Sequence, residues 1–207
     1  MDSVKFLKKI FLILIIFISS ISVYSQNKVF NNDKTKLGFD FGVGCQRINN
    51  NSLKFNLLNV KYTYNLYLFQ FQYYYSLYDN EKLSLESLIQ PQYNFAKYTF
   101  HDDSEEILTA HETGINIGFL IRKKIKKDFS LYFLISSGPH YVSGVPHRQS
   151  PGFIFSDNFN FGINIKASEN IYLDIRPGFR HISNAGIQNP NGGVNNLTLN
   201  VGFISSL

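Results

Sequence analysis

Apolar and polar residues alternate along most of the chain, and this period of two restricts its fold more than any other feature. Near the start, Leu37, Phe39 and Phe41 alternate with Gly38 and Asp40. Successive side chains of a strand leave opposite faces of the pleat, so this period predicts β-strands. The apolar residues keep the odd-numbered phase in residues 37–47, 67–77, 114–122, 129–137, 153–165, 171–179 and 197–203. The chain is therefore expected to be all-β.

The alternation is compatible with two architectures. A soluble sandwich or a lipocalin-like barrel turns the apolar face inward, whereas a membrane barrel turns it outward. The chain holds 20 Phe and 13 Tyr, and only 17% of its residues are charged, against about 25% in a typical globular chain. The polar faces also carry charges that could pair in a narrow lumen, namely Asp40, Glu86, Arg122, Asp174 and Arg176. We therefore favour the membrane barrel and keep the lipocalin-like barrel as the alternative.

The connections between the alternating segments predict the number of strands. Long polar connections are expected at 46–52, 100–108, 143–150 and 183–194, and short ones at 79–82, 123–128 and 166–170. Such alternation is typical of a barrel with one end outside the cell and the other in the periplasm. We predict an eight-stranded antiparallel transmembrane β-barrel, integral to the outer membrane of a Gram-negative cell, with a lumen filled by side chains. Residues 54–78 are too long for one regular strand, so a bend near Asn65 or an extra hairpin is expected there.

The first 25 residues have the pattern of a secretory signal peptide. Lys5, Lys8 and Lys9 precede an uninterrupted apolar run at 10–18, and Ser25 stands at the expected cleavage position. The run is shorter than the roughly 20 residues of a membrane-spanning helix. We expect residues 1–25 to be removed and residues 26–207 to form a single β-barrel domain.

Charge and cysteine content exclude some classes of protein. The formal net charge is +5, and the first 25 residues contribute +2 of it through three Lys and Asp2. The remaining +3 is too mild a balance to indicate a nucleic-acid partner. The single cysteine, Cys45, excludes an internal disulfide framework.

A histidine and a serine near the end of the seventh expected strand do not fit the outward apolar face. His181 and Ser183 are two residues apart and share the odd phase of Ile171 and Leu173. On a strand they would point together towards lipid. Serine becomes an effective nucleophile when a histidine accepts its proton. The pair is therefore a candidate catalytic site for a lipid substrate, and two ordinary loop residues are the alternative if the strand ends earlier.

The sequence around this pair resembles a known family. Residues 181–186 (HISNAG) and 189–193 (NPNGG) look like the C-terminal signature of the lipid A 3-O-deacylases, outer-membrane barrels that hydrolyse an ester-linked acyl chain of lipopolysaccharide. The resemblance implies that His181 is the general base and Ser183 the nucleophile. It also implies that Asn184 and the Gly186 amide form the oxyanion hole. It implies no metal and no cofactor.

One position departs from the family pattern. The family has a glutamate twelve residues after the serine, and this chain has Asn195 there. Asn195 keeps the outward phase and can accept a hydrogen bond from His181, as asparagine does in Cys-His-Asn sites. It cannot supply the negative charge that stabilises an imidazolium. Asp174 has the inward phase, so no carboxylate is identified as a substitute.

The sequence thus predicts an outer-membrane serine esterase that acts on lipid A. The alternative is a catalytically inactive structural or adhesion barrel. The expected partners are lipid A or lipopolysaccharide and the outer membrane, and a homodimer is left open. The other histidines are interpreted as loop or rim residues: His101, His111, His140 and His147.

Overall fold

The structure is a computed structural model that describes residues 34–206, except 47, 51–52, 56–60 and 103; for 48–50 and 53–55 it describes the backbone alone. The signal peptide expected at 1–25 lies outside the described residues. In the part of the chain that is described, no helix has the length and apolar character to cross a membrane.

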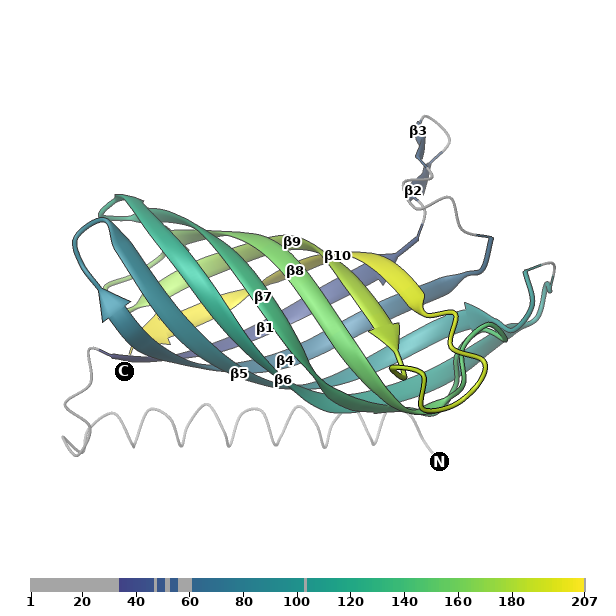
Figure 1. Cartoon of the computed structure of the whole chain (residues 1–207). Coiled ribbons are helices and arrows are strands. Elements are labelled where there is room, and N and C mark those ends of the chain that lie inside the picture. The colour runs from purple at the N-terminus through teal and green to yellow at the C-terminus, as the bar shows by residue number, and fades with distance from the viewer. Residues whose placement is uncertain (1–33, 47, 51–52, 56–60, 103, 207) are drawn as a thin grey trace, which may run out of the picture. The chain divides into compact units, whose positions relative to one another are not determined.

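Eight long strands close into an antiparallel barrel (Figure 1). Each pairs with the next long strand along the chain, and β1 closes the barrel by pairing with β10. The strands are β1 (Thr35–Cys45), β4 (Tyr64–Asp79), β5 (Leu83–Thr99), β6 (Ile107–Lys126), β7 (Phe129–Val142), β8 (Gly152–Lys166), β9 (Ile171–Ser183) and β10 (Val194–Ser206). The predicted eight-stranded barrel is confirmed.

The segment 54–78, which was too long for one strand, contains the end of a hairpin and nearly all of the barrel strand β4. A two-stranded sheet pairs β2 (Ile48–Asn50) with β3 (Leu53–Phe55). The barrel strand β4 then begins at Tyr64, next to the Asn65 at which a bend was expected. The expected polar connection at 46–52 thus includes part of this hairpin.

Side chains alternate between lumen and outer wall with the predicted phase. Odd-numbered residues face outward, and Phe161 and Phe119 are 69% and 58% exposed. Even-numbered residues such as Leu88 and Leu134 are fully buried. Cross-strand partners have the same parity on every pair of barrel strands where the ladder is regular, for example Phe41 opposite Phe69. The wall is therefore apolar and rich in aromatic residues, as a lipid-facing surface requires.

The lumen is filled by polar and charged side chains that pair with one another. Glu86 binds Arg122 and Lys36, and Arg176 binds Asp40. These partners include four of the five charges that were expected to pair. The fifth, Asp174, accepts hydrogen bonds from the Tyr132 hydroxyl and the Asn164 amide, both at 2.6 Å.

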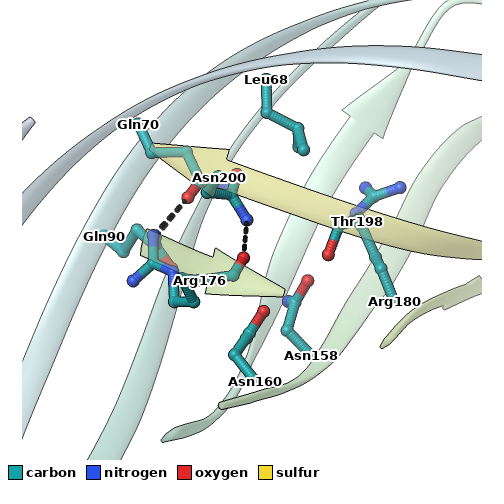
Figure 2. A pocket seen from close by; sticks show the side chains of 9 residues that line it. All are labelled: Leu68, Gln70, Gln90, Asn158, Asn160, Arg176, Arg180, Thr198 and Asn200. Atoms are coloured by element: carbon teal, nitrogen blue, oxygen red, sulfur yellow. Dashed lines mark hydrogen bonds between the residues drawn. The ribbon is translucent and has the colours of Figure 1, made fainter. Parts of the chain in front are cut away.

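The space left in the lumen is small. A polar cavity of about 10 Å³ lies among the side chains of Figure 2, where Arg176 and Arg180 approach from β9 and Asn158 and Asn160 from β8. That volume is about enough for one water molecule. The expectation of a filled lumen agrees with this packing.

His140 lies in the lumen and not in a loop. It belongs to β7, is 2% exposed, and contacts Glu112 and Asn116 through its two ring nitrogens. The expectation of a loop residue was wrong because β7 extends to Val142, where the even phase points inward. The expected basic turn at 123–128 is likewise shorter, since β6 continues to Lys126.

Long and short connections gather at opposite ends of the barrel, as Figure 1 shows. The short turns lie at the end where β10 finishes. The connection from β9 to β10 and the connection from β7 to β8 lie together at the other end. The candidate catalytic residues come from this loop end.

Candidate active site

His181 and Ser183 lie on the outer wall at the loop end of β9. The strand continues to Ser183, so both residues have strand geometry and point to the same face. Both side chains are half-buried. The two side chains therefore lie on the outward face of the barrel wall. Within the described residues, no hydrogen bond joins the Ser183 hydroxyl to His181.

Asn195 faces His181 across the β9–β10 ladder. The two residues are direct cross-strand partners, and His181 Nδ1 lies 2.6 Å from Asn195 Oδ1. The amide oxygen can only accept, so Nδ1 carries the proton of this hydrogen bond, and in the neutral ring it is Nε2 that has the lone pair. A histidine held in this tautomer can accept a proton from a serine through Nε2.

The backbone of Asn195 is held from the other side by residues that precede β4. Its N–H donates to the Tyr62 hydroxyl at 2.8 Å, and its carbonyl accepts from Gln46 Nε2 at 3.2 Å. Gln46 also binds both the N–H and the carbonyl of Tyr64. Burial raises the pKa of the Tyr62 phenol, which therefore stays neutral at pH 7. These contacts fix the strand end that presents the Asn195 amide to His181.

The two predicted oxyanion residues bind each other in the β9–β10 connection. The Gly186 N–H donates to Asn184 Oδ1 at 3.0 Å, and Asn184 Nδ2 donates to the Gln188 carbonyl at 2.6 Å. Asn184 is 2% exposed. The Gly186 amide is thus already engaged, whereas Asn184 Nδ2 carries a second hydrogen. The structure places both residues directly after Ser183 but shows them shaping the loop.

The β7–β8 connection binds the β9–β10 connection at the loop end of the barrel and forms a clamp on it. Arg148 Nη2 donates to the Gly192 carbonyl at 2.5 Å, and its guanidinium lies 5.0 Å from the centre of the Tyr62 ring. Gln149 Oε1 accepts the Gly193 N–H at 3.0 Å. Arg148 and Gln149 therefore connect the loop that follows Ser183 with the segment that supports Asn195. Sequence reasoning did not identify this clamp, because its contacts join distant loops.

Gly193 packs against the imidazole of His181. Its φ is +65°, in the left-handed region that favours glycine. A Cβ at this position would stand 2.5 Å from His181 Cε1 and 3.2 Å from Nε2. The backbone approaches the ring this closely only because the residue has no side chain.

This contact leads to a testable prediction. We expect Gly193→Ala to displace His181 and lower the rate of ester hydrolysis by about tenfold or more, since small misplacements of a catalytic group are costly. Gly152→Ala is the matched control: Gly152 has a φ of +100°, but a Cβ there would meet no atom within 4 Å, and the residue is not among the candidate catalytic groups. Hydrolysis rates of the two purified variants should differ clearly, and equal losses would attribute the effect to backbone strain.

A row of polar side chains that includes His181 crosses four strands on the outer wall. Ser137 of β7 is opposite Asp157 of β8, Asp157 is opposite His181, and His181 is opposite Asn195. We call these four residues the polar row. The next row towards the membrane is apolar throughout, and consists of Ile135, Phe159, Phe179 and Leu197. Sequence reasoning missed Asp157, although its odd number marks it as outward-facing.

The small lumen cavity is not part of this arrangement. Its lining residues have inward-facing side chains, whereas the polar row lies on the outer face of the same strands. Among the residues that the structure describes, no three His, Cys, Asp or Glu side chains are grouped so that they could hold a metal ion.

Fold and site together define an outer-membrane β-barrel with a histidine, a serine and an asparagine gathered on its lipid-facing wall. Residues 58–203 match the model of the lipid A 3-O-deacylase (PagL) family. The match spans more than half of the chain, which therefore belongs to this family and is integral to the outer membrane.

Solved structures of the same fold agree with this assignment. The crystal structure of the outer membrane enzyme PagL is 15% identical with a TM-score of 0.59, and the match covers 80% of this chain and 97% of that one. Neisserial surface protein A is 12% identical with a TM-score of 0.51, and the match covers 84% and 97%. At these identities the likeness concerns the fold alone. A search of curated proteins found no match.

Proposed function

We propose that this barrel hydrolyses an ester-linked acyl chain of lipid A by a serine–histidine mechanism. The observation that carries the proposal is the 2.6 Å hydrogen bond from His181 Nδ1 to Asn195 Oδ1, on the lipid-facing wall, two residues from Ser183. Membership of the deacylase family supports lipid A as the substrate. The outward position of the site supports a substrate that arrives from within the membrane.

The reaction follows from the tautomer of His181. Ser183 Oγ attacks the ester carbonyl carbon while Nε2 takes the hydroxyl proton, and a tetrahedral intermediate forms. Collapse of the intermediate breaks the bond to the sugar oxygen, which receives the proton from His181. Water then attacks the acyl-enzyme and gives a proton to His181. The second tetrahedral intermediate collapses as His181 returns this proton to Ser183 Oγ, and the fatty acid is released. Apo sites commonly have a long serine–histidine distance that shortens when substrate binds.

Asn184 and Asn195 have supporting roles in this scheme. The second hydrogen of Asn184 Nδ2 is the donor we assign to the oxyanion, and a single donor of this kind is worth about 10²–10³-fold in kcat. The Gly186 amide would have to leave Asn184 Oδ1 to act as a second donor. Asn195 fixes the ring orientation of His181. These catalytic side chains come from one chain, so the scheme does not require a homodimer.

Mass spectrometry of lipid A tests the proposal. Lipid A is extracted from outer membranes with the wild-type barrel, with Ser183→Ala at equal abundance, and without the protein. We expect the loss of one acyl chain only with the wild type. If lipid A is identical in all three samples, the barrel is not a lipid A deacylase, and the structural or adhesion function becomes the better interpretation.

Asn195 lacks the negative charge of the glutamate that the family has at this position, and this difference leads to a prediction. A hydrogen bond to a charged group is stronger than a neutral one by about 1 kcal/mol, so Asn195→Glu should raise kcat by about fivefold. Asn195→Gln is the control, because it has the same length without the charge. Initial rates on purified lipopolysaccharide provide the measurement. A lower rate for Asn195→Glu than for Asn195→Gln would mean that the site is built around a neutral amide.

A further inference from the structure

Asp157 is a carboxylate on a wall that otherwise faces lipid. It lies in β8 between the outward residues Phe155 and Phe159, and its side chain is half-buried. Charged side chains on the lipid face of a barrel are unfavourable, increasingly so towards the membrane centre. Its position therefore needs a compensating interaction or a function.

The contacts of Asp157 leave much of its charge uncompensated. Oδ1 accepts a hydrogen bond from the Ser137 hydroxyl at 2.5 Å. Within the described part of the chain, Asp157 forms no ion pair. The only ionisable side chain directly opposite it in the two neighbouring strands is His181, since Ser137 is the partner on the other side.

His181 is therefore flanked by two different groups. Asn195 on β10 binds Nδ1 and fixes the tautomer, while Asp157 on β8 is the cross-strand partner on the opposite side. Directly opposite residues of an antiparallel pair have Cβ atoms about 4.5–5.5 Å apart. At that separation a carboxylate attracts the positive charge that the imidazole acquires when it takes the proton of Ser183.

We infer that Asp157 supplies the negative charge that Asn195 lacks. The Asn195 amide orients His181, and the Asp157 carboxylate stabilises the imidazolium that forms during the reaction. Asp157 acts through His181 and is a positioning residue. The inference rests on the proposed serine–histidine mechanism, but it does not depend on which lipid is the substrate.

The test measures the reactivity of Ser183 with a fluorophosphonate probe as well as hydrolysis of lipopolysaccharide. In the probe reaction Ser183 Oγ bonds to phosphorus, fluoride leaves, and His181 takes the hydroxyl proton. We expect Asp157→Asn to slow labelling by about tenfold, and Asp157→Glu to stay within about threefold of the wild type. Asp128→Asn is the matched control, because Asp128 is an exposed carboxylate in the turn at the opposite end of the barrel.

A double-variant cycle distinguishes a charge effect from a structural one. In an Asn195→Glu background a second carboxylate already faces His181, so Asp157→Asn should slow labelling by less than about threefold. The inference is overturned if Asp157→Asn labels at the wild-type rate, or if its loss is the same in both backgrounds. It is also overturned if wild-type Ser183 does not react with the probe, because no serine–histidine pair then exists.

The measurement of lipopolysaccharide hydrolysis distinguishes a failure of this inference from a failure of the proposed substrate. If the wild type leaves lipopolysaccharide intact while labelling depends on Asp157 as described, lipid A is the wrong substrate and the role of Asp157 is supported. If both reactions depend on Asp157, both proposals are supported. Folding of each variant is verified by the resistance of the closed barrel to unfolding in detergent before heating.

Discussion

Ser183→Ala and His181→Ala should each reduce ester hydrolysis by on the order of 10⁴-fold or more, with little change in barrel stability. Removing the nucleophile or the base stops the same step, so the double variant should be no slower than either single variant. Both side chains lie on the outer wall, where an apolar replacement leaves no buried polar group unpaired. The measurement is the initial rate of fatty acid release from lipopolysaccharide by the purified barrel.

The serine control is Ser87, which also faces outward from a barrel strand but lies on β5, away from β9. Ser87→Ala should keep the wild-type rate. Substantial hydrolysis by Ser183→Ala would assign the reaction to another nucleophile. Additive losses for Ser183→Ala and His181→Ala would show that the two residues do not act as a unit.

Glu112→Gln should lower the free energy of unfolding by about 3–5 kcal/mol, because it leaves a buried guanidinium without its counter-charge. Glu112 is 1% exposed and accepts hydrogen bonds from Arg180, His140 and Asn94. Arg180 has the same degree of burial. Removing one member of such a pair lowers the free energy of unfolding by more than the intact pair adds to it, because the remaining charge stays in the lumen. Urea unfolding of the barrel in lipid vesicles provides the measurement.

An exposed ion pair serves as the comparison for Glu112. Lys124 binds Asp79 at 2.6 Å, with side chains 34% and 50% exposed. Asp79→Asn should change the unfolding free energy by less than about 1 kcal/mol, since solvent screens surface pairs. Removing both members of the lumen pair, as in Glu112→Gln with Arg180→Met, should cost less than the sum of the single changes. A Glu112→Gln loss as small as that of Asp79→Asn would mean that water reaches the lumen charges.

The period of two predicted the strands and their faces because it constrains every strand in the same way, while the aromatic content and the low charge favoured a membrane barrel over a soluble one. A one-residue change of register would exchange the apolar and polar faces, so the constant odd phase also predicted that His181, Ser183 and Asn195 face outward. It predicted the pairing of Arg122 and Arg176 with lumen carboxylates. Strand ends were less predictable, because nothing in the local pattern at His140 distinguishes the end of β7 from the start of a loop.

The position of Asp157 required pairing information that the alternation does not contain. The phase of a strand says which face a residue occupies, but not which residue of the next strand is opposite. The tight turn between β8 and β9 does contain that information. That turn pairs Lys166 with Tyr172, and counting back equally from this pair places Asp157 opposite His181. The loop contacts of Arg148, Gln149 and Asn184 had no such signal, since they depend on how separate connections pack at the barrel end.

His181 and Ser183 lie on the outer wall at the loop end of β9, and this has a consequence for selectivity. A reactive group on an outer wall has no enclosing pocket to measure the length of its substrate. It meets only those bonds that the bilayer holds at its own depth. If the barrel hydrolyses lipid A as proposed, we therefore expect that moving the His181 and Ser183 positions by two residues along β9 would change which ester bond is within reach.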